Sequence, residues 1–237
     1  MQSNKNVILD LCGGTGAWSQ PYKEAGYTVV IATLPEYDVV YVKLDLYLGK
    51  GKYGISFRNQ ITGTWDYVAY EDICGILAAP PCTEFSVAKT TRPRDFTQGM
   101  KPVEACMQII WEAQKHTRLD FWALENPRGF LRRFLGIPKY TFEQWQFGGD
   151  MKKATDIWGY FNIPTPTNKT NEGLKMKEFK GGRIRSASYA GAMKIPAEYA
   201  DYISTIKGHD AKRAAVRAIT PAGFAQAFYK ANKPRQG

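Results

Sequence analysis

The sequence predicts an α/β protein built around an open, mostly parallel sheet. Three observations carry this prediction. Short apolar runs alternate with segments of helical periodicity, a glycine-rich turn follows the first apolar run, and Cys82 and Glu125 stand directly after two later runs. With 237 residues the chain is long enough for one such domain and short for two. We therefore expect a single domain over residues 1–237.

The first elements form a βαβ unit. Residues 6–11, with the sequence Val-Ile-Leu-Asp-Leu after Asn6, have the mostly apolar pattern of a buried strand. Residues 18–25 begin a helix that tolerates Pro21 in its first turn. Gly26 ends that helix, and residues 27–32 are a second β-rich run. Strand, turn, helix and strand in so few residues predict two parallel strands joined by a right-handed crossover.

Three further strands are expected downstream. Residues 39–44 are a third strand candidate, and residues 49–71 indicate a loop or hairpin with a turn at Gly63. Residues 73–79 predict a fourth core strand and residues 121–124 a fifth, because both runs are apolar throughout.

The remaining segments are helices and loops. Residues 83–99 are polar enough for an active-site loop, and residues 103–117 have a helical pattern. Residues 164–182 resemble an exposed loop. Two helices are expected near the end of the chain, at residues 197–206 and 221–231.

Charge is divided unevenly along the chain. Residues 1–100 carry a net charge of −1, whereas residues 101–237 carry +11. A basic half suggests a polyanionic partner, with nucleic acid the first candidate and a merely basic, solvated surface the alternative. The chain has no apolar run of membrane-spanning length and no signal-peptide pattern in its first residues, so we expect a cytosolic location.

Metal sites and disulfides are not expected. No CxxC pair occurs among the four cysteines, which are Cys12, Cys74, Cys82 and Cys106. The two histidines, His116 and His209, are isolated in the sequence, and the surface is the common place for such residues.

Three segments that follow apolar runs carry the chemistry. In an open α/β sheet, ligands bind outside the carboxyl ends of the strands, so the turn at residues 10–16, Cys82 and Glu125 should converge on one crevice. The glycine turn lacks the last glycine of the dinucleotide pattern GxGxxG, which favours a nucleoside cofactor without pyrophosphate. A purely structural turn is the alternative.

The thiol and the acid suit covalent activation of a pyrimidine ring. Two prolines stiffen the backbone before Cys82, which favours a positioned nucleophile over a buried apolar cysteine. Glu125 follows an apolar run that would keep its carboxyl group neutral and able to donate a hydrogen bond. A helix cap or a surface ion pair is the alternative for Glu125.

These residues resemble the motifs of the cytosine C5 methyltransferases, which methylate carbon 5 of cytosine in DNA. Residues 10–18 resemble the first cofactor motif, and Pro80-Pro81-Cys82-Thr83-Glu84-Phe85-Ser86 resembles the nucleophile motif Pro-Pro-Cys-x-x-Phe-Ser. Glu125-Asn126-Pro127 resembles Glu-Asn-Val, with proline third as in the small phage-type branch. Arg183-Ile184-Arg185 resembles an Arg-x-Arg core, and residues 217–228 resemble the C-terminal motif. The motifs keep the family's order over nearly the whole chain.

The resemblance implies a Rossmann-like class I methyltransferase fold, a mostly parallel mixed sheet with helices on both faces. It implies S-adenosylmethionine as cofactor and double-stranded DNA as substrate, with a flipped cytosine attacked at carbon 6 by Cys82. Protonated Glu125 would bind N3 and the exocyclic amine, and Arg183 and Arg185 would support the pocket. The implied cofactor contacts are Asp10, Leu11, Cys12, Gly13, Gly14, Gly16, Trp18, Asp45, Pro80 and Phe224. The implied substrate contacts are Pro81, Ser86, Asn126, Pro127, Lys153 and Thr155.

The chain departs from the family at the cofactor site. Cys12 stands where the family has an aromatic residue over the adenine, so Trp18 or another ring must replace it. Residues 32–35 stand where an acid should hold the ribose hydroxyls. Glu36 or Asp38 is the expected substitute, with Asp45 reaching the adenine amine.

The largest departure is the missing target-recognition domain. Only about 30 residues separate Arg185 from Arg217, which leaves little chain for base contacts in the major groove. Residues 131–216 are basic and aromatic and would hold at most a rudimentary DNA-recognition element, so a protein partner or a dimer is a possible source of specificity. Phosphate contacts are expected from Lys152, Lys153, Lys169, Lys175, Lys177 and Lys180.

Two alternatives stay open at this point. The same thiol chemistry could serve a different one-carbon donor, or an RNA or nucleotide substrate. A non-catalytic nucleic-acid-binding protein that kept an old fold is the other alternative, although mere binding requires neither Cys82 nor Glu125.

Overall fold

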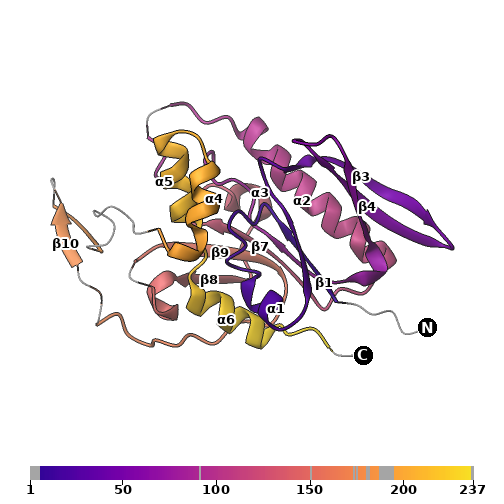
Figure 1. Ribbon diagram of the computed structural model, residues 1–237. Helices are drawn as coiled ribbons and strands as arrows, with labels where there is room; N and C mark the ends of the chain where they lie inside the picture. Colours follow the sequence, from indigo (N-terminus) through magenta and orange to yellow (C-terminus); the bar gives the residue numbers. More distant parts are fainter. Residues whose placement is uncertain are drawn as a thin grey trace.

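The fold is built around a six-stranded sheet with the strand order β2-β1-β6-β7-β9-β8 (Figure 1). The computed structural model describes residues 6–90, 92–149, 151–172, 174, 176–179, 182–186 and 195–235. The strands of the central sheet are β1 (Val7–Leu11), β2 (Thr28–Ala32), β6 (Ile73–Ala78), β7 (Phe121–Pro127), β8 (Tyr140–Glu143) and β9 (Ala154–Tyr160).

The sheet is mixed but mostly parallel, as predicted. Strands β2, β1, β6 and β7 run parallel to one another, whereas β9 pairs antiparallel with both β7 and β8. The apolar runs of β1 and β6 are buried along their whole length, which is why the sequence shows them as continuous rather than alternating patterns. The chain is therefore an α/β protein.

Helices cover both faces of this sheet, as predicted. One face packs against the long helix α2 (Phe96–His116), and the other packs against α1 (Gln20–Glu24) and α6 (Ala222–Ala231) (Figure 1). Successive residues of β1 point to opposite faces, so Leu9 belongs to the core under α2 and Ile8 to the core under α6.

The expected third strand lies outside the central sheet, and this corrects the sequence prediction. Strand β3 (Tyr37–Gly49) pairs antiparallel with β4 (Lys52–Asn59), which pairs with β5 (Trp65–Ala69) in a separate three-stranded sheet. Most of β3 is exposed or half-buried, which is typical of an antiparallel sheet with one face in solvent. The predicted hairpin is confirmed, with Gly63 at a φ of 75° in the turn.

Helix α2 begins earlier than predicted. The Asp95 side chain accepts a hydrogen bond of 2.9 Å from the Gln98 backbone N–H, and this cap starts the helix at Phe96. Pro102 lies inside the helix near its start.

The short elements fill the rest of the chain. They are the 3-10 helices η1 (Tyr70–Asp72), η2 (Gln144–Phe147) and η4 (Ala197–Tyr199), and the helices α3 (Arg132–Leu135), α4 (Ala200–Thr205) and α5 (His209–Ala218). Strands β10 (Met176–Phe179) and β11 (Arg183–Ser186) form a hairpin of their own, partly within the segment expected to be a loop. No helix in the described ranges is long and apolar enough to cross a membrane.

Candidate active site at the carboxyl ends of the strands

The glycine turn at residues 10–16, Cys82 and Glu125 lie at one edge of the central sheet. Strands β1, β6 and β7 are neighbours and run parallel, so their carboxyl ends meet at the same edge. The Ala79 N–H donates a hydrogen bond of 2.9 Å to the Leu11 carbonyl, which joins the segment before Cys82 to the glycine turn. The predicted convergence of the turn, Cys82 and Glu125 on one edge is therefore present.

The glycine turn closes tightly over Asp10. A Cβ atom on Gly13 would lie 2.4 Å from the Asp10 carboxyl carbon, so only glycine fits at this position. Cys12, Gly14 and Gly16 have φ values of 56°, 57° and 71°, a conformation that glycine adopts readily and cysteine rarely. The sequence pattern therefore reflects a real close approach of backbone to side chain.

Asp10 is an ionisable group in a dry environment. Its side chain is fully buried, and the Ser19 hydroxyl donates to Oδ2 over 2.5 Å. Burial raises the pKa of Asp10 to about 7, with the Ser19 hydrogen bond acting in the opposite direction. Within the described residues, Oδ1 has no hydrogen-bond partner. The turn therefore holds a buried acceptor that a ligand N–H or O–H group could satisfy.

Hydroxyl groups stand where the family resemblance calls for an acid. The Gly14 N–H donates to the Thr33 hydroxyl over 3.2 Å, and Tyr202 of α4 is hydrogen-bonded to Thr33. The Tyr202 hydroxyl lies 3.7 Å from the place of a Cβ on Gly14. Sequence analysis missed Tyr202, because no local pattern links α4 to the glycine turn.

Cys82 sits in a short turn after the two prolines. Its carbonyl accepts hydrogen bonds from the Phe85 and Ser86 N–H groups over 3.0 and 2.8 Å, and its side chain is half-buried. Burial raises the pKa of the Cys82 thiol, and the charge of Glu125 raises it further. Lys153 and Arg217 act in the opposite direction. One acid and two cations therefore act on the pKa of the thiol.

Glu125 lies on β7, beside the segment that carries Cys82. Burial raises the pKa of its carboxyl group, Lys153 opposes this shift, and Asp156 adds to it. A raised pKa favours the neutral carboxylic acid, which can donate a hydrogen bond. The charge of Glu125 thus raises the pKa of the Cys82 thiol, and Lys153 lowers the pKa of both groups.

Asn126 ties the two catalytic candidates together. Its buried side-chain amide donates a hydrogen bond of 2.9 Å to the Pro80 carbonyl. The Phe130 N–H donates to the Phe85 carbonyl over 2.9 Å, which adds a second link between the Cys82 loop and the chain after β7. The relative position of thiol and acid is therefore held by buried polar bonds.

A small cavity connects Glu125 to residues expected at the cofactor site. Its walls are Trp18, Glu125, Phe142, Gln144, Lys153, Thr155, Ala218, Ile219, Thr220, Pro221 and Phe224. The cavity volume is about 20 Å³, enough for one water molecule, so entry of a larger ligand requires these side chains to move. Trp18 and Phe224 are buried against Phe228 and belong to the core as well as to the cavity wall.

A buried ion pair supports this side of the site, and sequence analysis missed it. Arg132 binds Asp156 through two hydrogen bonds of 2.6 and 2.5 Å, and the Thr141 hydroxyl donates to Asp156 over 2.7 Å. Asp156 is fully buried, so these contacts neutralise a charge that would otherwise be costly. The three residues come from α3, β8 and β9, and nothing local links them.

The other predicted contacts lie at different depths along this edge. Leu11 and Pro80 are buried, as are Asn126 and Thr155, whereas Ser86 and Pro127 are half-buried and Pro81 is exposed. Lys153 is half-buried and donates a hydrogen bond of 2.7 Å to the Arg217 carbonyl. Lys153 therefore joins the site to the C-terminal segment.

The structure does not bring every predicted residue to this edge. Asp45 was predicted to reach the cofactor, but the structure places it elsewhere. It contacts His116 of α2 at the opposite edge of the sheet. Arg183 and Arg185 lie on β11, and only their backbone is described. Lys152 and Lys169 are exposed, Lys177 is described in its backbone alone, and Lys175 and Lys180 lie outside the described residues.

Neither a scan against models of protein families nor a search among curated proteins gave a match. What the protein does is therefore inferred from the residues at the strand ends. Those residues combine a thiol, a carboxyl group whose pKa is raised and two cations at one edge of an α/β sheet.

Proposed function

We propose that the protein is a DNA cytosine-C5 methyltransferase of the small phage type. The single observation that carries the proposal is the placement of Cys82 and Glu125 at the carboxyl ends of two adjacent parallel strands, joined by the hydrogen bond from Asn126 to the Pro80 carbonyl. Methyl transfer to carbon 5 of a pyrimidine requires a nucleophile at one ring atom and a neutral acid at another. The class I methyltransferase fold, with its mostly parallel mixed sheet, is part of this proposal.

The residues divide the work as follows. The Cys82 thiolate adds to carbon 6 of an extruded cytosine, and protonated Glu125 donates to N3, so electron density moves to carbon 5. S-adenosylmethionine, when bound, supplies an electrophilic methyl group. Once carbon 5 has taken the methyl group and S-adenosylhomocysteine has left, loss of the carbon-5 proton to water expels the Cys82 thiolate. N3 then returns its proton to Glu125, which leaves the enzyme unchanged.

The glycine turn is the proposed place for the cofactor. Gly13 lets the backbone approach closely, and the free acceptor of buried Asp10 suits a donor on the ligand. Thr33 and Tyr202 offer hydroxyl groups where the family resemblance calls for an acid. These features support a nucleoside cofactor.

Double-stranded DNA is the proposed substrate. Residues 101–237 carry a net charge of +11, and one of these cations, Arg217 of α5, lowers the pKa of the Cys82 thiol. Contacts from lysine and arginine to phosphate give affinity without sequence information. We therefore propose short or relaxed sequence specificity.

Transfer of label from tritiated S-adenosylmethionine to duplex DNA tests the proposal. We expect incorporation with the native chain and a loss of at least about 10³-fold with Cys82→Ser, because the nucleophile is removed. Cys74→Ala is the matched control, since Cys74 lies near the opposite end of β6. Thermal melting of each variant checks that it folds. Equal labelling by the native chain and Cys82→Ser would refute the proposal.

Two further measurements separate the remaining alternatives. A covalent adduct with DNA containing 5-fluorocytosine, absent in Cys82→Ser, would exclude a protein that only binds nucleic acid. Mass spectrometry of the modified base would then distinguish a methyl group from another one-carbon product, and RNA in place of DNA would test the substrate. Sequencing of methylated cytosines after expression in a bacterial host would give the recognised site.

A further inference from the structure

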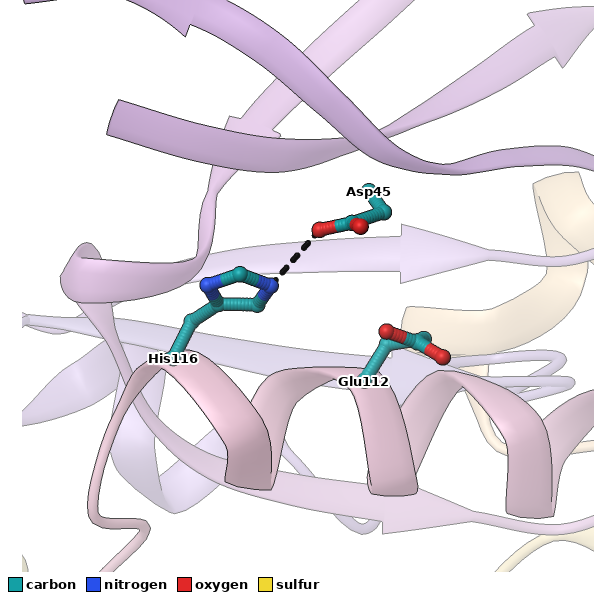
Figure 2. Close-up of side chains that lie close together, drawn as sticks. All are labelled: Asp45, Glu112 and His116. Carbon is teal, nitrogen blue, oxygen red and sulfur yellow. Dashed lines mark hydrogen bonds and ion pairs between the residues drawn. The ribbon is translucent and has the colours of Figure 1, made fainter. Parts of the chain in front are cut away.

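A second cluster of ionisable side chains lies away from the proposed active site. Figure 2 shows Asp45, Glu112 and His116 directed toward a common point between β3 and α2. One ligand atom from each residue lies within 4.8 Å of the other two. A single ion placed among them could contact all three.

The cluster sits at the amino ends of the parallel strands. His116 is the last residue of α2, and β7 begins shortly afterwards at Phe121. Tyr70, which accepts a hydrogen bond of 3.2 Å from the Asp45 N–H, begins the short helix η1 that leads directly into β6. Cys82 and Glu125 lie at the other ends of these strands, so the cluster is independent of them.

Two tyrosine rings hold the His116 imidazole in place. Tyr70 stacks on it with a centroid distance of 4.9 Å and an interplanar angle of 1°, and Tyr53 stacks on it at 5.0 Å and 20°. The Nε2 atom lies 2.7 Å from Asp45 Oδ1 (Figure 2). A fixed ring orientation lowers the entropy that is lost when the nitrogen binds a ligand.

The two helical residues have the spacing of a chelating pair. Glu112 and His116 are four residues apart on α2, so both project from the same helix face toward Asp45. Their side chains are 20% and 25% exposed and that of Asp45 is 52% exposed, so an ion from solvent can reach all three.

We propose that Asp45, Glu112 and His116 bind a divalent transition-metal ion of the Zn²⁺ class. One imidazole nitrogen and two carboxylate oxygens form a donor set that such ions accept, with water filling the remaining positions. Mg²⁺ and Ca²⁺ prefer all-oxygen sites and should bind far more weakly. Without the ion, Lys115 pairs with Glu112 at 2.7 Å and His116 pairs with Asp45, and the metal would replace both partners.

Titration with ZnCl₂ in a calorimeter tests the site on the intact protein. We expect binding of one equivalent that weakens at least about tenfold in His116→Asn and in Asp45→Asn, because each variant removes one ligand. His209→Asn is the matched control and should bind like the native chain. Melting curves show whether each variant is folded. If His116→Asn does not fold, Asp45→Asn still tests the site.

Lys115→Gln should change the affinity for Zn²⁺ in the opposite direction, toward tighter binding. The Lys115 ammonium occupies Glu112 in the metal-free protein, so its removal should tighten Zn²⁺ binding severalfold. A cluster that only stabilises the fold would show no such gain. Unchanged or weaker binding in Lys115→Gln therefore contradicts the proposal.

The two histidines allow a direct spectroscopic test that separates this site from the cysteines. In side-chain nitrogen NMR spectra we expect the His116 signals to shift on addition of Zn²⁺ and the His209 signals to stay in place. Binding that moves neither histidine would mean that the ion sits elsewhere, for example on Cys82, and would overturn the proposal.

Discussion

The two edges of the central sheet carry ionisable groups in contrasting surroundings. At the carboxyl edge, Asp10 and Asp156 are fully buried and Cys82 and Glu125 are half-buried. At the amino edge, the side chain of Asp45 is about half exposed and that of His116 one quarter exposed. Charges out of water interact strongly with each other and with the fold, whereas exposed charges are screened. Substitutions should therefore be costly at the carboxyl edge and mild at the amino edge.

The largest effect is expected from the charge of Asp10. Its pKa is about 7 in the folded protein, against an ordinary 3.8, so the folded state retains the proton to higher pH than the unfolded state. Stability should fall as pH rises from about 4 to about 7, by about 4 kcal/mol in total, and Asp10→Asn should lack this loss. Urea unfolding across this range measures it, with the exposed Asp201→Asn as control. Parallel pH profiles for the native chain and Asp10→Asn would contradict the prediction.

Removal of Arg132 should come next. Arg132→Ala leaves the fully buried Asp156 without its bidentate partner, which we expect to lower the unfolding free energy by about 3 kcal/mol. Among the described residues, the side chain of exposed Arg133 contacts the Phe130 ring, so Arg133→Ala should cost less than about 1 kcal/mol. Similar losses of unfolding free energy in the two variants would contradict the prediction that the buried partner Asp156 makes Arg132 the more important residue.

Asn126 should have a smaller effect on stability. Asn126→Ala removes the hydrogen bond to the Pro80 carbonyl inside the protein, and we expect a loss of about 1–2 kcal/mol in chemical denaturation. Asn168→Ala removes an exposed bond of the same kind to the Trp145 carbonyl and provides the comparison. The two variants should differ, because only Asn126 leaves a buried carbonyl unpaired.

Substitutions of Glu125 and Lys153 should shift the pKa of the Cys82 thiol in opposite directions. In the pH range where the thiol titrates, Glu125→Gln removes the negative charge of the ionised carboxylate and should lower the pKa of Cys82, whereas Lys153→Gln removes a positive charge and should raise it. The pH dependence of alkylation by iodoacetamide, followed by mass spectrometry of the Cys82 peptide, reports both shifts. Shifts of the same sign would show that the two groups do not act on the thiol through their charge.

The smallest effect is expected at the amino edge. Asp45→Asn weakens an exposed contact with His116, so we expect the melting temperature to change by less than about 4 °C. A change as large as that of Arg132→Ala would remove the contrast between the two edges.

The strands that carry the proposed chemistry were predictable because they are buried on both faces. The run at β6 is apolar throughout and that at β1 is interrupted only by the buried Asp10. The β7 run predicted at residues 121–124 continues to Pro127. Strand β3 was expected as a strand, but its sheet was not, because an alternating pattern does not reveal its partner. Strand β9 escaped prediction since its antiparallel pairing with β7 depends on contacts remote in sequence.

The candidate site was predictable in part for the same reason. Cys82 and Glu125 directly follow or end adjacent strands, and parallel topology alone brings them together. The partners that tune them come from elsewhere: Asp156 from β9 and Arg217 from α5. Asp45 was assigned to the wrong edge, because the position of β3 beside the end of α2 is a tertiary property.

The hydrogen bond from Lys153 to the Arg217 carbonyl has a consequence for synthesis on the ribosome. The wall of the cavity beside Glu125 is completed by Ala218, Ile219, Thr220, Pro221 and Phe224, which are translated after every other part of the wall. A nascent chain that already contains Cys82 and Glu125 therefore lacks this part of the wall until residues 218–224 have been synthesised. Termination before α6 would also remove Phe224 and Phe228 from the core on that face of the sheet, so we expect the truncated chain to lose its fold as well as the enclosure.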